Sequence, residues 1–228
     1  MAKIKSKSKS EFSAAIGQAQ RVGIFGASGC GKSTKSRELI KGLQRVIYFE
    51  PLADDIRKLE SEDKFKICVG LYALATELQK RWQKGFKLAY FPSLDAEEAD
   101  LSVLSSYLMR IQSGYGITHA AQITLVVDEL DLSFPTGICQ KMPRNGFKNL
   151  CCRGRHTGIN IIGLSQRMHL IDNVFRANCN AFYLFRHAEP ADIDTGIKIL
   201  GREYRQQFKD LNNFEYIYKE GQKIFVKK

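Results

Sequence analysis

The stretch GASGCGKS, residues 26–33, decides how the rest of the chain is interpreted. It matches the pattern G-x-x-x-x-G-K-[ST], in which glycines let the backbone curl so that successive N–H groups point inward at phosphate oxygens. An apolar run, RVGIF (21–25), precedes it, and a run suited to a helix, TKSRELIKGLQ (34–44), follows it. A strand before and a helix after are the context that this phosphate-binding loop, the P-loop, requires. The sequence therefore predicts a P-loop rather than a chance match in a glycine-rich loop.

The loop assigns expected roles to its residues. The helix after it would present its positive dipole end to the phosphates. Lys32 is expected to reach the β- and γ-phosphates of a nucleotide, taken as ATP, and Ser33 to give its hydroxyl to Mg²⁺. Cys30 stands at a variable position of the pattern and needs no chemical role of its own. The predicted nucleotide-binding residues are Gly26, Ala27, Ser28, Gly29, Cys30, Gly31, Lys32, Ser33 and Thr34.

The bulk composition limits the class of protein. A chain of 228 residues with 44% apolar content suits one α/β domain with a full core. No apolar run approaches the roughly 18 residues of a membrane span, and no apolar stretch follows the basic start MAKIKSKSKS as it would in a signal peptide. The six cysteines form no C-x-x-C pair and no zinc-like spacing. We therefore expect a cytosolic protein with reduced thiols.

The charge is strongly positive and unevenly placed. A formal net charge of +11 indicates an anionic partner, a nucleic acid or a membrane surface, in addition to the nucleotide. Residues 1–18 are expected to form a basic, disordered tail, and residues 19–228 a single P-loop ATPase domain. Residues 132–188 hold eight Lys or Arg against one acid, Asp172. This segment is either a solvated basic face, a phosphate-contacting surface or a subunit interface.

Strand-like and helix-like runs alternate along the chain, which predicts a three-layer α/β fold with a largely parallel central sheet. The last segment, 214–228, alternates around Glu220-Gly221 and predicts a C-terminal hairpin. Asp95 and Glu98 are spaced as a capping box for the next helix, and residues 131–142 are expected to form a loop. Strands are predicted at 21–26, 45–50, 64–70, 86–91, 123–130, 158–166 and 181–187, and helices at 32–43, 145–154 and 190–200.

Two further motifs follow strands of this sheet. Asp128 comes after an apolar run and fits a Walker B aspartate, which holds Mg²⁺ directly or through water. Glu129, beside it, can polarise a water for in-line attack on the γ-phosphate and so favours hydrolysis. Gln166 ends the strand IIGLS and could bond the γ-phosphate or the attacking water. Because ligands of parallel sheets bind at the carboxyl ends of strands, Gly26, Asp128 and Gln166 are expected at one edge.

The residues of segment 151–187 carry a resemblance to a known family. The stretches VVDEL (126–130) and CRGRHTGINIIGLSQRMHLIDNVFRANCNAFYLFRH (152–187) resemble the FtsK/HerA superfamily of DNA-pumping ATPases. The single-domain form looks most like the genome-packaging ATPases of membrane-containing icosahedral double-stranded DNA viruses. The resemblance covers about residues 20–200. Residues 52–100 and 131–143 carry no motif that matches the family.

The resemblance implies a homo-oligomeric ring, a hexamer in the family, with nucleotide at subunit interfaces and double-stranded DNA in the channel. It implies that Gln166 is the nucleotide sensor and that one arginine of region 153–186 acts in trans on the neighbouring site. Arg155 and Arg176 are the leading candidates, ahead of Arg153 and Arg186. Partners at a capsid vertex, and a location in the cytoplasm of an infected cell or at the virion vertex, are implied as well.

Three functions therefore stay open at this point. The first is a double-stranded DNA translocase that packages a viral genome into a preformed capsid. The second is a membrane-associated phage assembly ATPase, whose basic tail would contact anionic lipid although no transmembrane segment is predicted. The third is a nucleotide-dependent scaffold without enzymatic activity, which the intact Lys32, Ser33, Asp128 and Glu129 disfavour.

Overall fold

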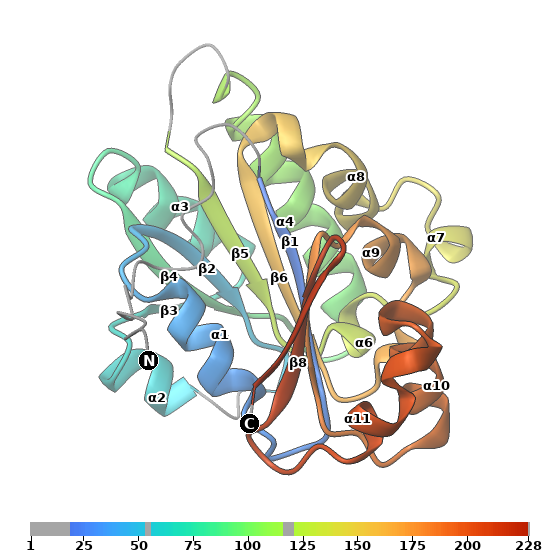
Figure 1. Cartoon of the computed structure of the whole chain (residues 1–228). Coiled ribbons are helices and arrows are strands. Elements are labelled where there is room, and N and C mark those ends of the chain that lie inside the picture. The colour runs from blue at the N-terminus through green and yellow to red at the C-terminus, as the bar shows by residue number, and fades with distance from the viewer. Residues whose placement is uncertain (1–18, 53–55, 116–120, 228) are drawn as a thin grey trace.

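The central sheet is built from apolar, mostly β-branched or aromatic segments of four to seven residues. The computed structural model describes residues 19–52, 56–115 and 121–227. The strands in this part of the chain are β1 (Arg21–Phe25), β2 (Arg45–Phe49), β3 (Lys66–Val69), β4 (Phe86–Phe91), β5 (Ile123–Val127), β6 (Ile159–Ser165), β7 (Ala181–Phe185), β8 (Tyr216–Glu220) and β9 (Lys223–Lys227). Their order across the sheet is β3-β4-β2-β5-β6-β1-β7-β8-β9 (Figure 1).

Strand direction separates the sheet into two parts. From β3 to β7 all neighbouring strands run parallel, whereas β7–β8 and β8–β9 are antiparallel. The C-terminal hairpin that the sequence predicted is thus β8–β9, and it extends the sheet beyond β7. The predicted fold class, an α/β P-loop fold with a largely parallel sheet and a C-terminal hairpin, is confirmed.

Helices connect the parallel strands and cover both faces of the sheet (Figure 1). The side chain of Asn145 starts one of them by accepting the amide of Lys148 at 2.9 Å, a typical N-cap. Three short 3₁₀ helices are η1 (Gly154–Thr157), η2 (Met168–Leu170) and η3 (Arg202–Tyr204). The labelled α-helices are α1 (Lys32–Ile40), α2 (Ile56–Ser61), α3 (Leu71–Arg81), α4 (Glu97–Ile111), α6 (Leu130–Ser133), α7 (Ile138–Lys141), α8 (Gly146–Arg153), α9 (Asn173–Asn178), α10 (Pro190–Leu200) and α11 (Arg205–Lys209).

The hydrophobic core consists of two layers, one on each face of the sheet. Successive residues of a strand point to opposite faces, so Val126 packs in one layer while Leu125 and Val127 pack in the other. The first layer includes Leu39 of α1 and Leu59 of α2. The second, larger layer is formed with helices α3, α4, α8, α9 and α10. This packing on both faces holds the strand ends in a fixed register.

The register aligns the carboxyl ends of the central strands at one edge of the sheet. Phe25 pairs with Ser165, and Phe49 pairs with Val127, so the last residues of these strands lie level with one another. The residues that follow them in the chain therefore emerge together. This edge carries the P-loop, and the site described below is built on it.

Some local expectations were wrong. Asp95 has φ 60° and does not cap α4, whose N-cap is Ala96 without a side-chain bond. The physical reason is the backbone, because an N-cap residue typically adopts an extended conformation and Asp95 is left-handed. The predicted loop 131–142 contains most of α6 and all of α7. The predicted basic tail, residues 1–18, lies outside the described residues.

Candidate nucleotide site

The P-loop is held by both strands that flank β1. The amide of Gly26 donates to the carbonyl of Ser165 at 3.2 Å, and the amide of Ala27 donates to the carbonyl of Arg186 at 2.9 Å. Gly31 has φ 109°, a conformation that glycine adopts without steric cost, and no described side chain caps α1 there. The backbone donors at the start of α1 are therefore not covered by a capping side chain, as a phosphate site requires.

Lys32 lies folded over the loop. Only 7% of it is exposed, and its Nζ donates to the carbonyl of Ala27 at 3.0 Å. An ammonium group has three donors, so this bond leaves donors for phosphate oxygens. The half-buried Ser33 follows at the first turn of α1, and both residues line the same cavity.

A polar cavity of about 160 Å³ lies at the carboxyl edge of the sheet. It brings together the predicted P-loop, Walker B and sensor residues, which are spread over residues 28–166 of the sequence. Its lining residues are Ser28, Gly29, Lys32, Ser33, Glu50, Leu52, Asp128, Glu129 and Gln166. The remaining predicted nucleotide-binding residues, Gly26, Ala27, Cys30, Gly31 and Thr34, are not among the residues that line this cavity.

Asp128 is held by the strand next to its own. The buried hydroxyl of Tyr48 donates to Asp128 Oδ2 at 2.8 Å, and the amide of Glu129 donates to Oδ1 at 3.0 Å. Burial, followed by the Asp128 charge, raises the pKa of Tyr48 well above its usual value. Tyr48 therefore remains a proton donor at any physiological pH, and it fixes the orientation of the carboxylate.

Glu129 and Gln166 are bonded to each other across the cavity. Gln166 Nε2 donates to Glu129 Oε1 at 2.6 Å. Glu129 has φ 40°, in the left-handed region, and this backbone turn directs the chain from β5 into α6. Burial raises the pKa of Glu129, and the bond from Gln166 opposes that rise because it favours the charged form. A carboxylate with a raised pKa beside a phosphate site suits proton abstraction from water.

Glu50 is a cavity residue that the sequence analysis missed. It follows β2, is 2% exposed, and its Oε1 accepts the amide of Leu52 at 3.3 Å. Its position in the sequence could have identified it, because Glu50 directly follows an apolar strand. Asp128 was predicted from the same pattern. The run RVIYFE (45–50) carried that signal.

The cavity provides oxygen ligands of the kind that Mg²⁺ prefers. The described residues contain no group of three or more His, Cys, Asp or Glu that could hold a metal ion by themselves. Magnesium in nucleotide sites is instead bound by one or two carboxylates together with phosphates and waters. Ser33, Asp128 and Glu50 fit that pattern.

The two leading candidates for a trans-acting arginine lie away from this cavity. Arg155 lies in η1, before β6, so the seven residues of that strand, about 20 Å, separate it from Gln166. Arg176 of α9 is half-buried, and burial lowers its pKa. Arg186 lies beside the P-loop, where its Nε donates to Asn213 Oδ1 at 3.0 Å. Arg155 and Arg176 stay predictions, because a residue acting in trans belongs to a neighbouring copy.

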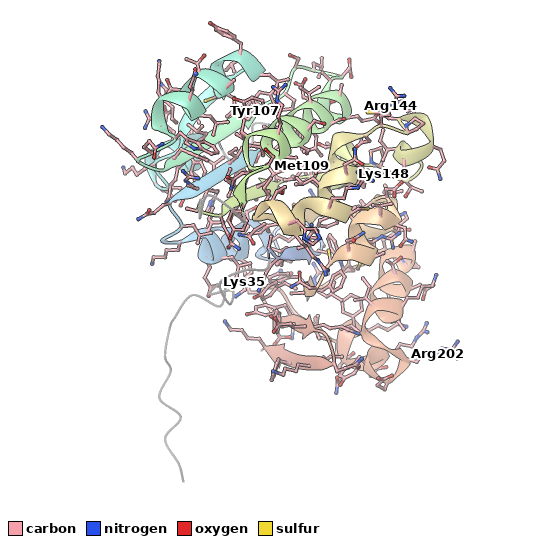
Figure 2. All side chains as sticks on the ribbon, turned by 90° about the horizontal axis from the view of Figure 1, so that it is seen from above. Lys35, Tyr107, Met109, Arg144, Lys148 and Arg202 are labelled. Atoms are coloured by element: carbon pink, nitrogen blue, oxygen red, sulfur yellow. The ribbon has the colours of Figure 1, made fainter. Side chains whose placement is uncertain are left out.

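The basic segment forms an exposed surface on α7, α8 and η1. Figure 2 shows Arg144 and Lys148 on the side of the molecule that carries α7 and α8. Arg153 and Arg155 are exposed at the end of α8 and in η1. The Lys141 side chain is 71% exposed and pairs with Glu98 at 2.7 Å. This surface is well suited to polyanions.

Searches against protein-family models and against curated protein sequences find no match. The fold, in contrast, matches solved structures over almost the whole chain. The genome packaging NTPase B204 from Sulfolobus turreted icosahedral virus 2, solved in complex with AMPPCP, aligns with a TM-score of 0.66 at 13% identity. That alignment covers 92% of this chain and 97% of B204.

Two further structures share this fold. VirB4 of Thermoanaerobacter pseudethanolicus aligns with a TM-score of 0.61 at 11% identity, covering 90% of this chain and 88% of VirB4. The ATPase 2 and 3 segment of EssC from Geobacillus thermodenitrificans aligns at 0.56 and 15% identity, covering 91% of this chain and 39% of the EssC structure. The fold that the resemblance implied is thus confirmed.

Among residues 19–52, 56–115 and 121–227, none of the helices has both the length and the apolar content needed to cross a bilayer.

Proposed function

We propose that the chain is an ATPase that hydrolyses ATP to translocate double-stranded DNA, and that it packages a viral genome into a preformed capsid. The observation that carries the enzymatic part is the cavity in which Lys32, Ser33, Asp128, Glu129 and Gln166 converge. The translocation part is supported by the fold shared with B204, whose structures are described as those of a genome packaging NTPase, and by the basic surface.

The geometry suggests a division of roles. Lys32 and the amides at the start of α1 would bind the β- and γ-phosphates, and Ser33 and Asp128 would hold Mg²⁺ in the cavity that Glu50 also lines. The bound metal would neutralise charge on the phosphates. Glu129 takes a proton from a water whose oxygen attacks the γ-phosphorus. The bond to the bridging oxygen then breaks, giving ADP and inorganic phosphate.

Gln166 links the presence of the γ-phosphate to the position of the base. Its amide donates to Glu129 at 2.6 Å. A γ-phosphate in the cavity offers charged oxygens to the same amide, which would release Glu129 toward the attacking water. Gln166 would in this way act both as sensor and as restraint on premature hydrolysis.

The enzymatic proposal is tested by Glu129→Gln. We expect ATP binding to persist and the hydrolysis rate to fall by about 100- to 10,000-fold, the contribution of a general base. Glu60→Gln, at an exposed position of α2, is the matched control and should hydrolyse ATP normally. Rates must be measured against protein concentration, because an arginine supplied by a neighbour makes turnover depend on assembly. Normal hydrolysis by Glu129→Gln in the assembled form would remove Glu129 as the base.

The DNA proposal is tested on the basic surface. A double charge reversal, Arg144→Glu with Lys148→Glu, should weaken double-stranded DNA binding. It should also reduce the slope of log binding constant against log salt concentration by about one for each phosphate contact that is lost. Arg202→Glu is the control, because Figure 2 shows Arg202 at a different end of the molecule, beside the C-terminal helices. An ATPase rate that double-stranded DNA never stimulates in the assembled ring would refute translocation.

VirB4 and EssC share the fold as well, so the fold by itself does not identify double-stranded DNA as the substrate. The DNA-stimulation assay makes that choice. A hexameric ring and a capsid vertex as the docking partner belong to the same proposal. Electron microscopy of the assembled, ATP-bound chain tests the ring directly.

A further inference from the structure

One large aromatic side chain lies exposed beside the P-loop and has no role in the mechanism above. Phe214 is 69% exposed, although its backbone amide donates to the carbonyl of Cys30 within the P-loop at 3.1 Å. Its ring lies close to the loop as well, because a Cβ placed on Gly31 would lie 3.2 Å from Phe214 Cδ1. In Figure 1 the segment that leads into β8 passes the turn after β1 at the lower edge of the sheet.

The backbone holds Phe214 in this exposed position. Its φ is 69°, a left-handed conformation that is uncommon for a bulky residue. The residues on both sides are fixed, since Asn213 Oδ1 accepts Arg186 Nε at 3.0 Å and Glu215 Oε2 accepts the amide of Asn212 at 2.8 Å. An exposed ring on a segment that is bonded on both sides is already ordered for contact with a ligand.

The sheet order defines where the two ends of a bound nucleotide must lie. The γ-phosphate end is marked by Glu50, Asp128, Glu129 and Gln166, which follow strands β2, β5 and β6 on one side of β1. The nucleoside must therefore leave the P-loop toward the other side, where β7 and β8 lie. Phe214 lies two residues before β8, and therefore on this side of the P-loop.

We propose that Phe214 is the platform on which the base of the nucleotide stacks. The inference rests on the proposed function, that the P-loop binds a nucleoside triphosphate. Base–aromatic stacking tolerates any base because every base has a π-face. Phe214 therefore contributes affinity for purine nucleotides in general and little preference between ATP and GTP.

The test compares two ligands that share phosphates but not a base. Calorimetry measures the affinity for Mg²⁺–ATP and for Mg²⁺–tripolyphosphate with the wild-type chain, Phe214→Ala and Phe214→Tyr. Phe214→Ala should weaken ATP binding about tenfold, within the range of base stacking, and leave tripolyphosphate binding unchanged. Phe214→Tyr should retain ATP affinity, since it retains the ring. Phe225→Ala, another exposed phenylalanine at 58%, is the control and should bind both ligands normally.

Three outcomes overturn the inference. Equal loss of ATP and tripolyphosphate affinity in Phe214→Ala would mean that the residue supports the loop rather than the base. Unchanged ATP affinity would remove the platform, and unchanged ATP affinity with impaired self-association would assign Phe214 to a subunit contact instead. A wild-type chain that binds neither ligand would overturn the proposed function, and this inference with it. Because the ring is exposed, Phe214→Ala should melt at the wild-type temperature, which circular dichroism checks.

Discussion

The hydrogen bond from Tyr48 to Asp128 provides a direct test of how the site is assembled. Tyr48→Phe removes one hydroxyl and keeps the ring, so it leaves packing in the first core layer unchanged. The removed bond is 2.8 Å long, buried, and accepted by a carboxylate. Hydrogen bonds to charged groups contribute about 1.5–3 kcal/mol. For a chain of this size, a loss of about 2 kcal/mol lowers the melting temperature by roughly 4–8 °C.

The same substitution should weaken the proposed magnesium site. Residues that orient a metal ligand contribute about 10- to 100-fold to metal affinity, so the Mg²⁺ concentration for half-maximal ATPase activity should rise by that factor. Thermal unfolding in EDTA measures the stability effect without metal. Tyr107→Phe, in the groove between α3 and α4, is the control and should change neither quantity. If Tyr48→Phe left both the melting temperature and the Mg²⁺ dependence unchanged, the bond would not hold Asp128 in place.

Three further predictions concern the remaining ionisable groups. Glu50→Gln should raise the Mg²⁺ requirement of ATP hydrolysis while the affinity for Mg²⁺-free ATP, measured in EDTA, stays unchanged. Gln166→Ala removes a bond that lowers the pKa of Glu129, so the acidic limb of the pH profile of kcat/KM, which reports the free enzyme, should move to higher pH. Burial lowers the pKa of His187 to about 4, whereas the unfolded chain protonates it near pH 6.5. Folding stability should therefore be full above about pH 6.5 and fall by about 3 kcal/mol as the pH drops to 4, and urea titrations should show a smaller fall in His187→Asn.

The elements that the sequence predicted well are those whose signal is local. A buried parallel strand requires a continuous apolar run, so the runs ITLVV and INIIGLS predict β5 and β6 directly. The positions of Asp128 and Gln166 followed from the same runs, because a residue after a parallel strand lies at the carboxyl edge. The convergence of these two residues with Lys32 in one cavity agrees with that expectation.

The features that the sequence did not predict depend on backbone conformation or on tertiary contacts. Asp95 had the spacing of a cap, but its backbone is left-handed at φ 60°, and the chain enters α4 through Ala96 instead. The position of Phe214 beside the P-loop arises from a contact between segments about 180 residues apart, which no local pattern encodes. The trans-acting arginine requires the geometry of a second copy, which a single sequence does not contain.

The backbone conformation of Glu129 lowers the stability of the fold at a position that the proposed catalysis requires. A glutamate at φ 40° costs about 1 kcal/mol relative to glycine, which adopts that conformation freely. Burial of its carboxylate adds to that cost. A selection for thermal stability alone should therefore replace Glu129 by Gly, giving a chain that melts higher and does not hydrolyse ATP. Glu129 is in this way a costly residue that only catalysis can maintain.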